Sequence, residues 1–478
     1  MADKVRFLLK NISLFTLGEV GTKIISFFLV PLYTHVLTTN QYGTIDLIFT
    51  ISVIITPLIM LNIGEAMMRF LLDENVDHNK IMSVGIIVFI FGVIISLLIV
   101  PIASKIEILS NYKWYMYFYI ILFSTKSLLT GYLRGMNKLQ HYAICNILNA
   151  FLIAIFNILF LVVLDMGIEG YFLAYILAEA CAIIYAIIYG KIFYSIKKFN
   201  FDKNLSKSMI IFSLAIVPNS LLWWVINSSE RIMVTTFRGL SENGLLAVSY
   251  KIPSLLVVLN TIFTQSWKYS AIKEKDSCDN EKFTNEMFDK YIRLIIILSA
   301  FLILIIKILV KLLFSSSYYN SWISSCFLLM GFVFSGISTF IGTVYYVKKD
   351  MVGNMLSALF GAIINIFLNI LFIPVIGFSG AAIATMLCYL YILLYRYYDT
   401  KKYQKIKLFK KDYIFLLILI VVMIVGNLLD NLYGNIILIL GFICIFTFNY
   451  KYIRNNLKKI IKLTLIMKKR RKYEKIIK

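Results

Sequence analysis

The chain has 478 residues, of which 60% are hydrophobic and only 15% are charged, and its formal net charge is +23. A soluble globular domain carries roughly a quarter charged residues, so this composition excludes an ordinary soluble protein and indicates a polytopic membrane protein. The positive charge alone would suggest a nucleic-acid partner. The cations lie between apolar runs instead of on one soluble face, which argues against nucleic acid.

Hydropathy predicts an all-α fold with fourteen membrane-spanning helices and no loop long enough for a soluble domain. The predicted spans are 11–33, 43–66, 81–103, 113–133, 143–164, 169–193, 207–229, 244–267, 290–313, 320–346, 353–374, 378–399, 412–429 and 434–452.

The charge of the connections predicts the topology of the chain in the membrane. Lysine and arginine gather before the first span and after the even-numbered spans, and a Lys-Lys-Arg-Arg-Lys run lies at 468–472. The alternate connections are poor in cations, and 34–42 and 165–168 contain none. Because basic loops remain in the cytoplasm, we expect both termini to be cytoplasmic.

An internal repeat divides the chain into related halves. An Asn-Ile-Leu-Phe phrase begins at Asn157 and again 212 residues later at Asn369, and each copy runs into a Gly-x-x-Gly turn. Six spans separate the copies, so both have the same orientation and form parallel repeats. We expect a six-helix half over 1–200, a second over 201–400, and two extra helices with a basic tail over 401–478.

Ionisable side chains inside the predicted spans are the first candidates for function, because charge in hydrocarbon is costly and usually faces a cavity or a partner. Glu19 and Lys23 lie four residues apart in the first span, where they either neutralise each other or face a cavity. Lys126 has no acidic partner in its own span and is either a cavity residue or a lysine that snorkels to the interface. Glu179, near mid-membrane in the sixth span, is the best placed group for coupling to a proton or cation; an inter-helix hydrogen bond is the alternative.

Two adjacent tryptophans, Trp223 and Trp224, lie toward the end of the seventh span. An aromatic belt at the membrane interface is the ordinary role of such residues, and stacking against a sugar is the alternative.

No catalytic motif is present. The three histidines fall in or beside short loops without metal-ligand spacing, the six cysteines form no Cys-x-x-Cys pair, and there is no Walker A phosphate loop. We therefore predict no catalytic residue, no metal site and no cofactor, and a protein that is not an enzyme. Transport would then be driven by an ion gradient, the membrane potential or the substrate gradient.

Three segments resemble the bacterial polysaccharide flippases of the multidrug/oligosaccharidyl-lipid/polysaccharide exporter superfamily. They are FLVPLYTHVLTTNQYGTIDLI at 28–48, SSERIMVTTFRGLSENGLLAVSYKI at 228–252 and NILFIPVIGFSGAAIAT at 369–385. The resemblance implies a transporter in the bacterial cell membrane. Such a protein moves undecaprenyl-diphosphate-linked oligosaccharides from the inner to the outer leaflet by alternating access, for cell-surface polysaccharide biosynthesis.

The resemblance also places Arg231 and Lys251 in the family's cationic motif, where they would bind the substrate diphosphate. We add Lys23 and Lys126 to this substrate-binding set because they are cations inside predicted spans. Glu230 stands where the family more often has aspartate, so it is either a coupling group or a partner of Arg231.

The ion-coupling candidates are therefore Glu179, Glu19 and Glu230. The implied partners are a lipid-linked oligosaccharide, membrane lipids, and a polysaccharide polymerase with its export machinery.

Two other functions remain as alternatives. A cation-coupled multidrug antiporter of the same superfamily would need an acidic cavity, whereas Lys23, Lys126 and Lys251 favour an anionic substrate. A membrane-embedded sugar polymerase or acyltransferase would need a sizeable outer loop or a His/Asp-type centre, and the sequence shows neither.

Overall fold

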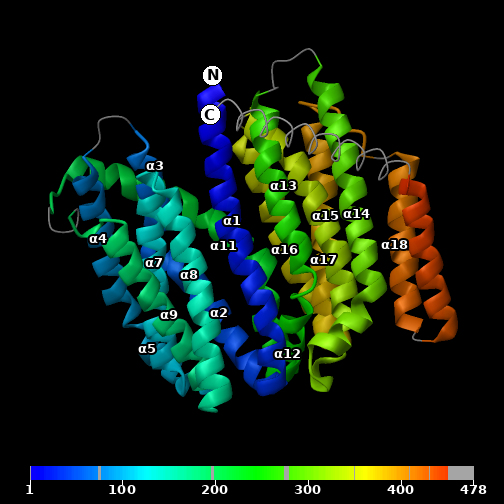
Figure 1. The fold of residues 1–478 in the computed structure, drawn as a ribbon, viewed down its shortest axis with the longest axis horizontal. Coiled ribbons are helices and arrows are strands. Elements are labelled where there is room, and N and C mark those ends of the chain that lie inside the picture. The colour runs from blue at the N-terminus through cyan, green and yellow to red at the C-terminus, as the bar shows by residue number, and fades with distance from the viewer. Residues whose placement is uncertain are drawn as a thin grey trace, which may run out of the picture. The chain divides into compact units, whose positions relative to one another are not determined.

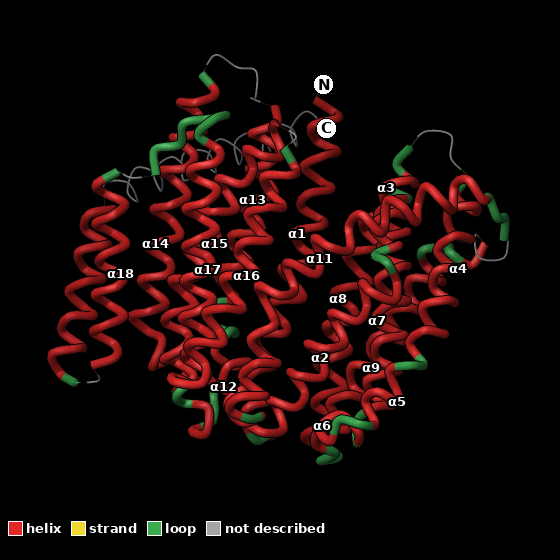
Figure 2. Tube along the Cα trace, turned by 180° about the vertical axis from the view of Figure 1, so that it is seen from behind, coloured by secondary structure: helices red, strands yellow, loops and turns green. Residues whose placement is uncertain are grey.

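The computed structural model describes residues 2–73, 77–194, 199–273, 279–348, 350–408, 410–429 and 431–450. Over these residues the secondary structure is helical, joined by short loops (Figure 2). The chain divides into two compact units, one of residues 1–275 and 307–403 and one of residues 276–306 and 404–478. Each is described separately.

The first unit begins with helices that correspond to the first six predicted spans. They are α1 (Ala2–Val36), α2 (Thr39–Met60), α3 (Ile63–Leu71), α4 (His78–Ser96), α5 (Ile99–Ser104), α6 (Glu107–Ser110), α7 (Lys113–Gly135), α8 (Leu139–Asn157), η1 (Ile158–Val163) and α9 (Gly167–Tyr189). Helix α9 packs against α7 and α8, and α3 packs against α7, so these helices form a group of their own (Figure 1).

The same unit continues with the helices of the second predicted half. They are α11 (Lys203–Arg238), α12 (Leu240–Ser249), α13 (Ser254–Lys273), the end of α14 (Asn280–Leu313), η2 (Ser316–Tyr318), α15 (Ser321–Lys348), α16 (Met351–Ile376) and α17 (Phe378–Thr400). Helix α15 is the best buried of them, with 83% of its most apolar window inside the protein, because α12, α13 and α17 pack around it.

The predicted count of fourteen spans is not confirmed, although a helix lies over each predicted range. Eleven of the described helices are long and apolar enough to cross a membrane, or twelve if α12 and α13, which meet at a 47° bend, form one broken span. Helix α7 falls short because Lys113, Lys126 and Arg134 lower its hydropathy. Among the described side chains of α1, Val20–Val36 forms an apolar stretch.

Local sequence signals position the two helices that matter most for the site. Thr38 and Gln41 form a reciprocal capping box at the start of α2. Asp202 caps the start of α11 by accepting hydrogen bonds from the backbone of Asn204 and Leu205. The Leu205 N–H and then the ammonium of Lys80, 3.0 Å away, hold the pKa of Asp202 below its usual range.

The N-terminal and C-terminal helices of the first unit meet where α2 packs against α12. Gly43 and Gly244 allow this approach, because a Cβ at Gly43 would overlap the carbonyl of Leu240 and a Cβ at Gly244 would overlap the carbonyl of Thr39. The side-chain amide of Asn243 donates to the Gly43 carbonyl at 2.9 Å. The first predicted half and most of the second thus lie in one compact unit, whereas residues 276–306 belong to the other unit. The division at residues 200 and 400 remains a prediction.

The second unit contains the start of α14, α18 (Lys411–Leu429) and the helix Leu432–Tyr450. Arg293 joins these elements through Asp289 on its own helix, Asp412 on α18, and Asn449, at 2.9 to 3.2 Å. A guanidinium with two carboxylates and an amide satisfies the polar requirements of helices that are otherwise apolar.

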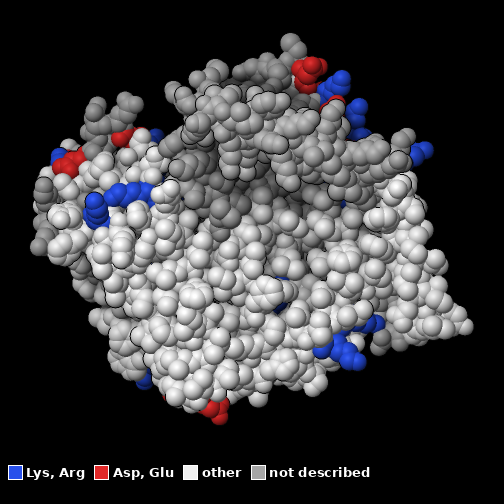
Figure 3. All heavy atoms as spheres, in the orientation of Figure 1, with Lys and Arg blue, Asp and Glu red and all other residues white. Residues whose placement is uncertain are grey.

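On the face drawn in Figure 3, most charged side chains gather toward the upper and lower margins. The band between them consists almost entirely of uncharged residues. This distribution is typical of a protein whose middle faces lipid.

Candidate functional site

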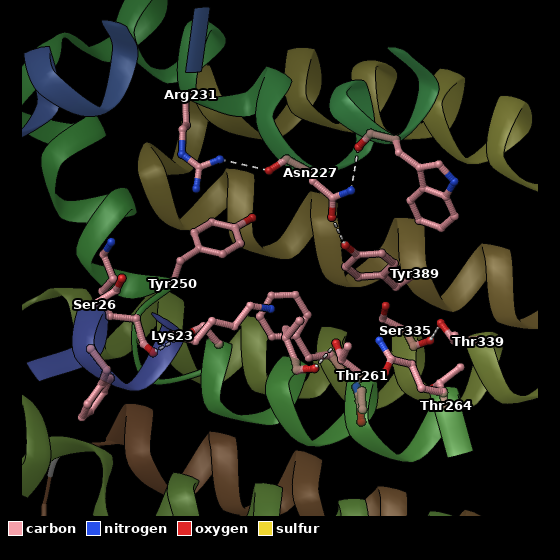
Figure 4. Close-up of a pocket in the computed structure, with 18 of the residues that line it drawn as sticks. Lys23, Ser26, Asn227, Arg231, Tyr250, Thr261, Thr264, Ser335, Thr339 and Tyr389 are labelled. Atoms are coloured by element: carbon pink, nitrogen blue, oxygen red, sulfur yellow. Dashed lines mark hydrogen bonds between the residues drawn. The ribbon is translucent and has the colours of Figure 1, made fainter. Parts of the chain in front are cut away.

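The first unit encloses a cavity of about 630 Å³ that is large enough for a sugar-sized ligand. Its lining comes from α1, α11, the turn 250–253 between α12 and α13, α13, α15 and α17, as Figure 4 shows for most of the residues. The lining residues used below are Lys23, Trp223, Asn227, Arg231, Tyr250, Lys251, Ser254, Thr261, Thr264, Gln265, Lys268, Ser335, Thr339 and Tyr389.

Four cations line this cavity: Lys23, Arg231, Lys251 and Lys268. Among the side chains that the structure describes, no carboxylate lies within ion-pair distance of the three lysines. The ammonium of Lys251 instead lies 5.8 Å from the ring centre of Tyr42, and the ammonium of Lys268 lies 4.4 Å from the ring centre of Tyr346. The cavity therefore has a strongly positive lining.

Arg231 is the cation that links the two groups of helices in the first unit. Its Nε lies 2.8 Å from Oδ2 of Asp46 on α2, and its guanidinium lies 4.9 Å from the ring centre of Tyr250. It also donates to the backbone carbonyl of Asn227, one turn earlier on α11 (Figure 4). The ion pair with Asp46 holds Arg231 at the cavity wall while leaving it within reach of a ligand.

Glu230 does not pair with Arg231, although the two are adjacent in the sequence. Because neighbouring residues of a helix point in different directions, the side chain of Glu230 points into the contacts between helices, where it is fully buried. Its Oε1 accepts a 2.6 Å hydrogen bond from Tyr250, and its Oε2 accepts one from Thr385 at 3.3 Å. Glu230 and Arg231 thus form no direct ion pair, although their charges act on each other. The role of Glu230 as a coupling group or as a partner of Arg231 remains a prediction.

Lys126 and Glu179 pair with each other outside the cavity lining. The ammonium of Lys126 lies 2.7 Å from Glu179 Oε1 and 3.1 Å from the amide oxygen of Asn149. Their side chains are 13% and 3% exposed, so the pair is buried between α7, α8 and α9. The inter-helix hydrogen bond considered for Glu179 is present, and Lys126 supplies it.

The other two predicted site residues lie on α1. Lys23 points into the cavity between Tyr250 and Thr261 (Figure 4). Glu19 also lies in α1, but its side chain is outside the part of the chain that the structure describes.

Sequence reasoning missed three charged residues near the cavity. Asp46 lies near the start of the second predicted span, and Lys268 directly follows the eighth. Arg396 was overlooked, although an arginine inside an apolar span is itself a signal of a buried polar site. It is 3% exposed.

Arg396 has only neutral hydrogen-bond acceptors among the described residues. It donates to the hydroxyl of Ser357, the amide oxygen of Asn354 and the carbonyl of Ser338, at 3.0 to 3.2 Å. Its guanidinium lies 5.9 Å from the ring centre of Trp223, which lines the cavity. A positive charge thus lies behind the cavity wall without an acid to balance it. Trp223 lines this cavity, and the interfacial role expected for it remains a prediction.

No cluster of three or more His, Cys, Asp or Glu side chains suited to a metal ion occurs among the described residues. Among the described residues, Cys145, Cys326 and Cys388 are buried.

Residues 8–267 match the family model described as polysaccharide biosynthesis protein, which covers more than half of the chain. The chain belongs to this polysaccharide biosynthesis family. A search among curated proteins gives no match.

Solved structures with a similar fold are membrane transporters. The lipid II flippase MurJ in an inward closed conformation superposes with a TM-score of 0.71 at 15% identity, over 93% of this chain and 99% of that protein. A multidrug resistance transporter of the MATE family, in an inward-facing conformation, gives a TM-score of 0.64 at 14% identity, over 81% of this chain and 94% of that protein. This member of the polysaccharide biosynthesis family therefore has the fold shared by these transporters.

Proposed function

We propose that the protein is a flippase that moves undecaprenyl-diphosphate-linked oligosaccharide units from the inner to the outer leaflet of a bacterial cell membrane, for cell-surface polysaccharide biosynthesis. The observation that carries this proposal is the cation-lined cavity inside an apolar helical protein of the polysaccharide biosynthesis family. A diphosphate must cross a region of low dielectric constant, and buried or partly buried cations offset its charge there.

Arg231 and Lys251 are the groups that we assign to the diphosphate. Both line the cavity, and guanidinium and ammonium groups are the side chains that bind phosphate oxygens best. Lys23 faces the same space from α1. Lys126 would reach a substrate only in a conformation in which its pair with Glu179 opens.

The rest of the lining suits a sugar. Amide and hydroxyl groups of Asn227, Thr261, Gln265 and Tyr389 can exchange hydrogen bonds with sugar hydroxyls. The ring of Trp223 offers an apolar face for stacking against a sugar ring.

The contacts between α2 and α12 suggest which side of the cavity is closed. Besides the glycine contact, the hydroxyls of Thr39 and Ser241 lie 2.7 Å apart, and Tyr318 donates to the carbonyl of Leu37 at 3.0 Å. With both termini in the cytoplasm, as the positive-inside pattern predicts, these contacts lie on the outer side. The structure then represents an inward-facing state of an alternating-access cycle.

Ion coupling remains a proposal for Glu179, Glu230 and Glu19. Glu179 and Glu230 are both buried carboxylates held by hydrogen-bond donors, so a change in protonation would disturb helix contacts on either side of the cavity. The proposed partners beyond the lipid-linked sugar and membrane lipids are a polysaccharide polymerase and its export machinery.

A multidrug antiporter is the second candidate, because the MATE fold is similar. Cationic drugs would be repelled by Lys23, Lys251 and Lys268; among the described side chains no carboxylate lies within ion-pair distance of these lysines. The charge of the cavity thus favours the flippase.

The deciding experiment is a leaflet-translocation assay in proteoliposomes that contain undecaprenyl-diphosphate-linked oligosaccharide, with and without an imposed proton or sodium gradient. Protein-dependent appearance of the sugar on the opposite leaflet supports the flippase, and its response to each gradient identifies the coupling ion. Efflux of cationic dyes without sugar translocation would instead support the antiporter.

A further inference from the structure

The cavity is elongated along α13, which places its cations at two separate ends. Ser254 and Lys268 both line it and lie fourteen residues apart on this helix, about 21 Å along the axis. Arg231 lies over Tyr250, close to the Ser254 end. Figure 4 shows Arg231 at one side of the cavity and Thr264 and Thr339 at the other. Lys268 follows Thr264 by one turn and therefore belongs to this second end.

The positive charge of the lining exceeds what one diphosphate needs. Asp46 pairs with Arg231 and its charge also acts on Lys251, whereas Lys23 and Lys268 have no carboxylate within ion-pair distance among the described side chains. A diphosphate that links a lipid to a sugar carries about two negative charges. Even if it displaced Asp46 from Arg231, the group at one end would not contact a lysine about 20 Å away along the helix.

The stretch between the two ends is neutral and polar. Thr261, Thr264 and Gln265 of the neighbouring helix α13 line this stretch together with Ser335 and Thr339 of α15. Figure 4 shows Thr261, Thr264, Ser335 and Thr339. Hydroxyl and amide groups of this kind bind sugar hydroxyls without adding charge. A chain of sugars can therefore extend from the first cationic end to the second.

Arg396 strengthens the positive potential at the second end. It donates to the carbonyl of Ser338, the neighbour of Thr339, and no described acid balances it. In surroundings of low dielectric constant an unbalanced guanidinium raises the potential of the adjacent cavity wall. Lys268 in the cavity and Arg396 behind the wall thus both raise the electrostatic potential at the second end.

We infer that the Lys268 end is a second anion subsite, which binds an anionic substituent, a carboxylate or a phosphate, on the glycan while the diphosphate occupies Arg231 and Lys251. This inference rests on the proposed function and names its substrate class: a lipid-linked oligosaccharide with an acidic repeat unit.

The test compares three undecaprenyl-diphosphate oligosaccharides of equal length, one neutral, one with a uronic acid and one with a phosphate substituent. Binding to the purified full-length protein is measured by titration calorimetry, and translocation is measured in proteoliposomes. We expect at least one acidic ligand to bind about tenfold more tightly than the neutral ligand, because it gains a charge-assisted hydrogen bond. The ligand with the larger gain identifies the substituent.

The variant Lys268→Gln should remove this preference while leaving binding of the neutral ligand unchanged. Lys268→Arg, which keeps the charge, should retain most of the preference for acidic ligands. This result would show that the loss in Lys268→Gln does not arise from misfolding. Lys251→Ala should weaken binding of all three ligands. Lys311→Gln, which removes an exposed lysine of α14 outside the cavity, should change none of them and serves as the matched control.

Equal affinity of the wild type for neutral and acidic ligands would overturn the inference, as would a loss of neutral-ligand binding in Lys268→Gln. In either case translocation of the neutral ligand would leave the flippase proposal standing. Failure to bind or move any of the three ligands would overturn both proposals.

Discussion

At the scale of single residues, the pair of Lys126 and Glu179 shows how one buried charge requires another. The two side chains are nearly inaccessible and lie 2.7 Å apart, so removal of one leaves the other without compensation. We expect Glu179→Gln to lower the free energy of unfolding by about 3–5 kcal/mol. Thermal unfolding of the purified protein, followed by intrinsic fluorescence, measures this change.

The double substitution of Lys126→Met with Glu179→Leu tests whether the loss of stability comes from an unbalanced charge or from altered packing. Removing both charges should recover most of the lost stability, because no unbalanced charge remains. A double variant as unstable as Glu179→Gln would contradict this explanation. If Glu179 also couples transport to protons, stable variants at this position should translocate sugar without responding to a pH gradient.

Arg231 and Lys251 should act through substrate binding rather than through folding. Alanine at either position should reduce translocation at least tenfold while the amount of protein in the membrane stays unchanged. Arg231→Lys should keep part of the activity if a point charge suffices, and less if the guanidinium binds phosphate through two parallel hydrogen bonds. Translocation and membrane abundance are measured in parallel. A loss of abundance would point to a structural role.

The sequence predicted the identity of several site residues better than their partners. Lys23, Arg231 and Lys251 were singled out and do line the cavity. Asp46, in contrast, lies 185 residues before Arg231, and nothing in a single sequence indicates that two helices so far apart bring them together. The same reason explains why Lys126 and Glu179 were recognised separately but not as a pair.

At the scale of helices, the contact between α2 and α12 depends on two glycines. Gly43→Leu would force a side chain into the carbonyl of Leu240, so α2 and α12 should separate. A cysteine pair at Thr39 and Ser241, whose hydroxyls are 2.7 Å apart, measures this separation through disulfide formation. Cross-linking should be efficient in the parent protein and strongly reduced in the Gly43 variant.

Gly21→Ala is the matched control for this test. A Cβ at Gly21 would meet Ile147 at 3.5 Å, which is ordinary van der Waals contact, so cross-linking should remain efficient. Equal cross-linking in the Gly43→Leu variant would show that the backbone adjusts without separating the helices.

Helix positions were predictable because long apolar runs dominate the sequence, and a helix lies over every predicted span. The number of spans was less predictable. Pro253 removes a backbone donor and helps to break the eighth span into α12 and α13, whereas the charges of α7 lower its hydropathy without preventing a helix. Hydropathy depends only on composition, whereas the break between α12 and α13 and the helix formed by α7 depend on packing inside the protein.

At the scale of the whole molecule, we propose that the ion pair between Asp46 and Arg231 acts as a latch, and we expect a bound substrate to compete with Asp46 for Arg231. Asp46 belongs to the N-terminal helices of the first unit and Arg231 to the C-terminal ones. Asp46→Asn should therefore weaken the closed contacts and lower the efficiency of the Thr39–Ser241 cross-link in the absence of substrate.

A charge exchange distinguishes the latch from the binding site. Asp46→Arg combined with Arg231→Asp should restore the cross-link, because opposite charges again face each other. It should not restore translocation, because an aspartate now occupies the position assigned to the diphosphate. Recovery of both activities would show that Arg231 serves the latch alone.

The positive lining of the cavity also determines how the protein must be handled in the laboratory. Phosphate, citrate and sulfate in a buffer are small anions, and we expect them to occupy the proposed sites at Arg231, Lys251 and Lys268 and to compete with any ligand under study. Anionic phospholipids carried through purification will do the same. Meaningful affinities therefore require zwitterionic buffers, delipidated samples and a stated ionic strength, since salt weakens attraction between exposed charges.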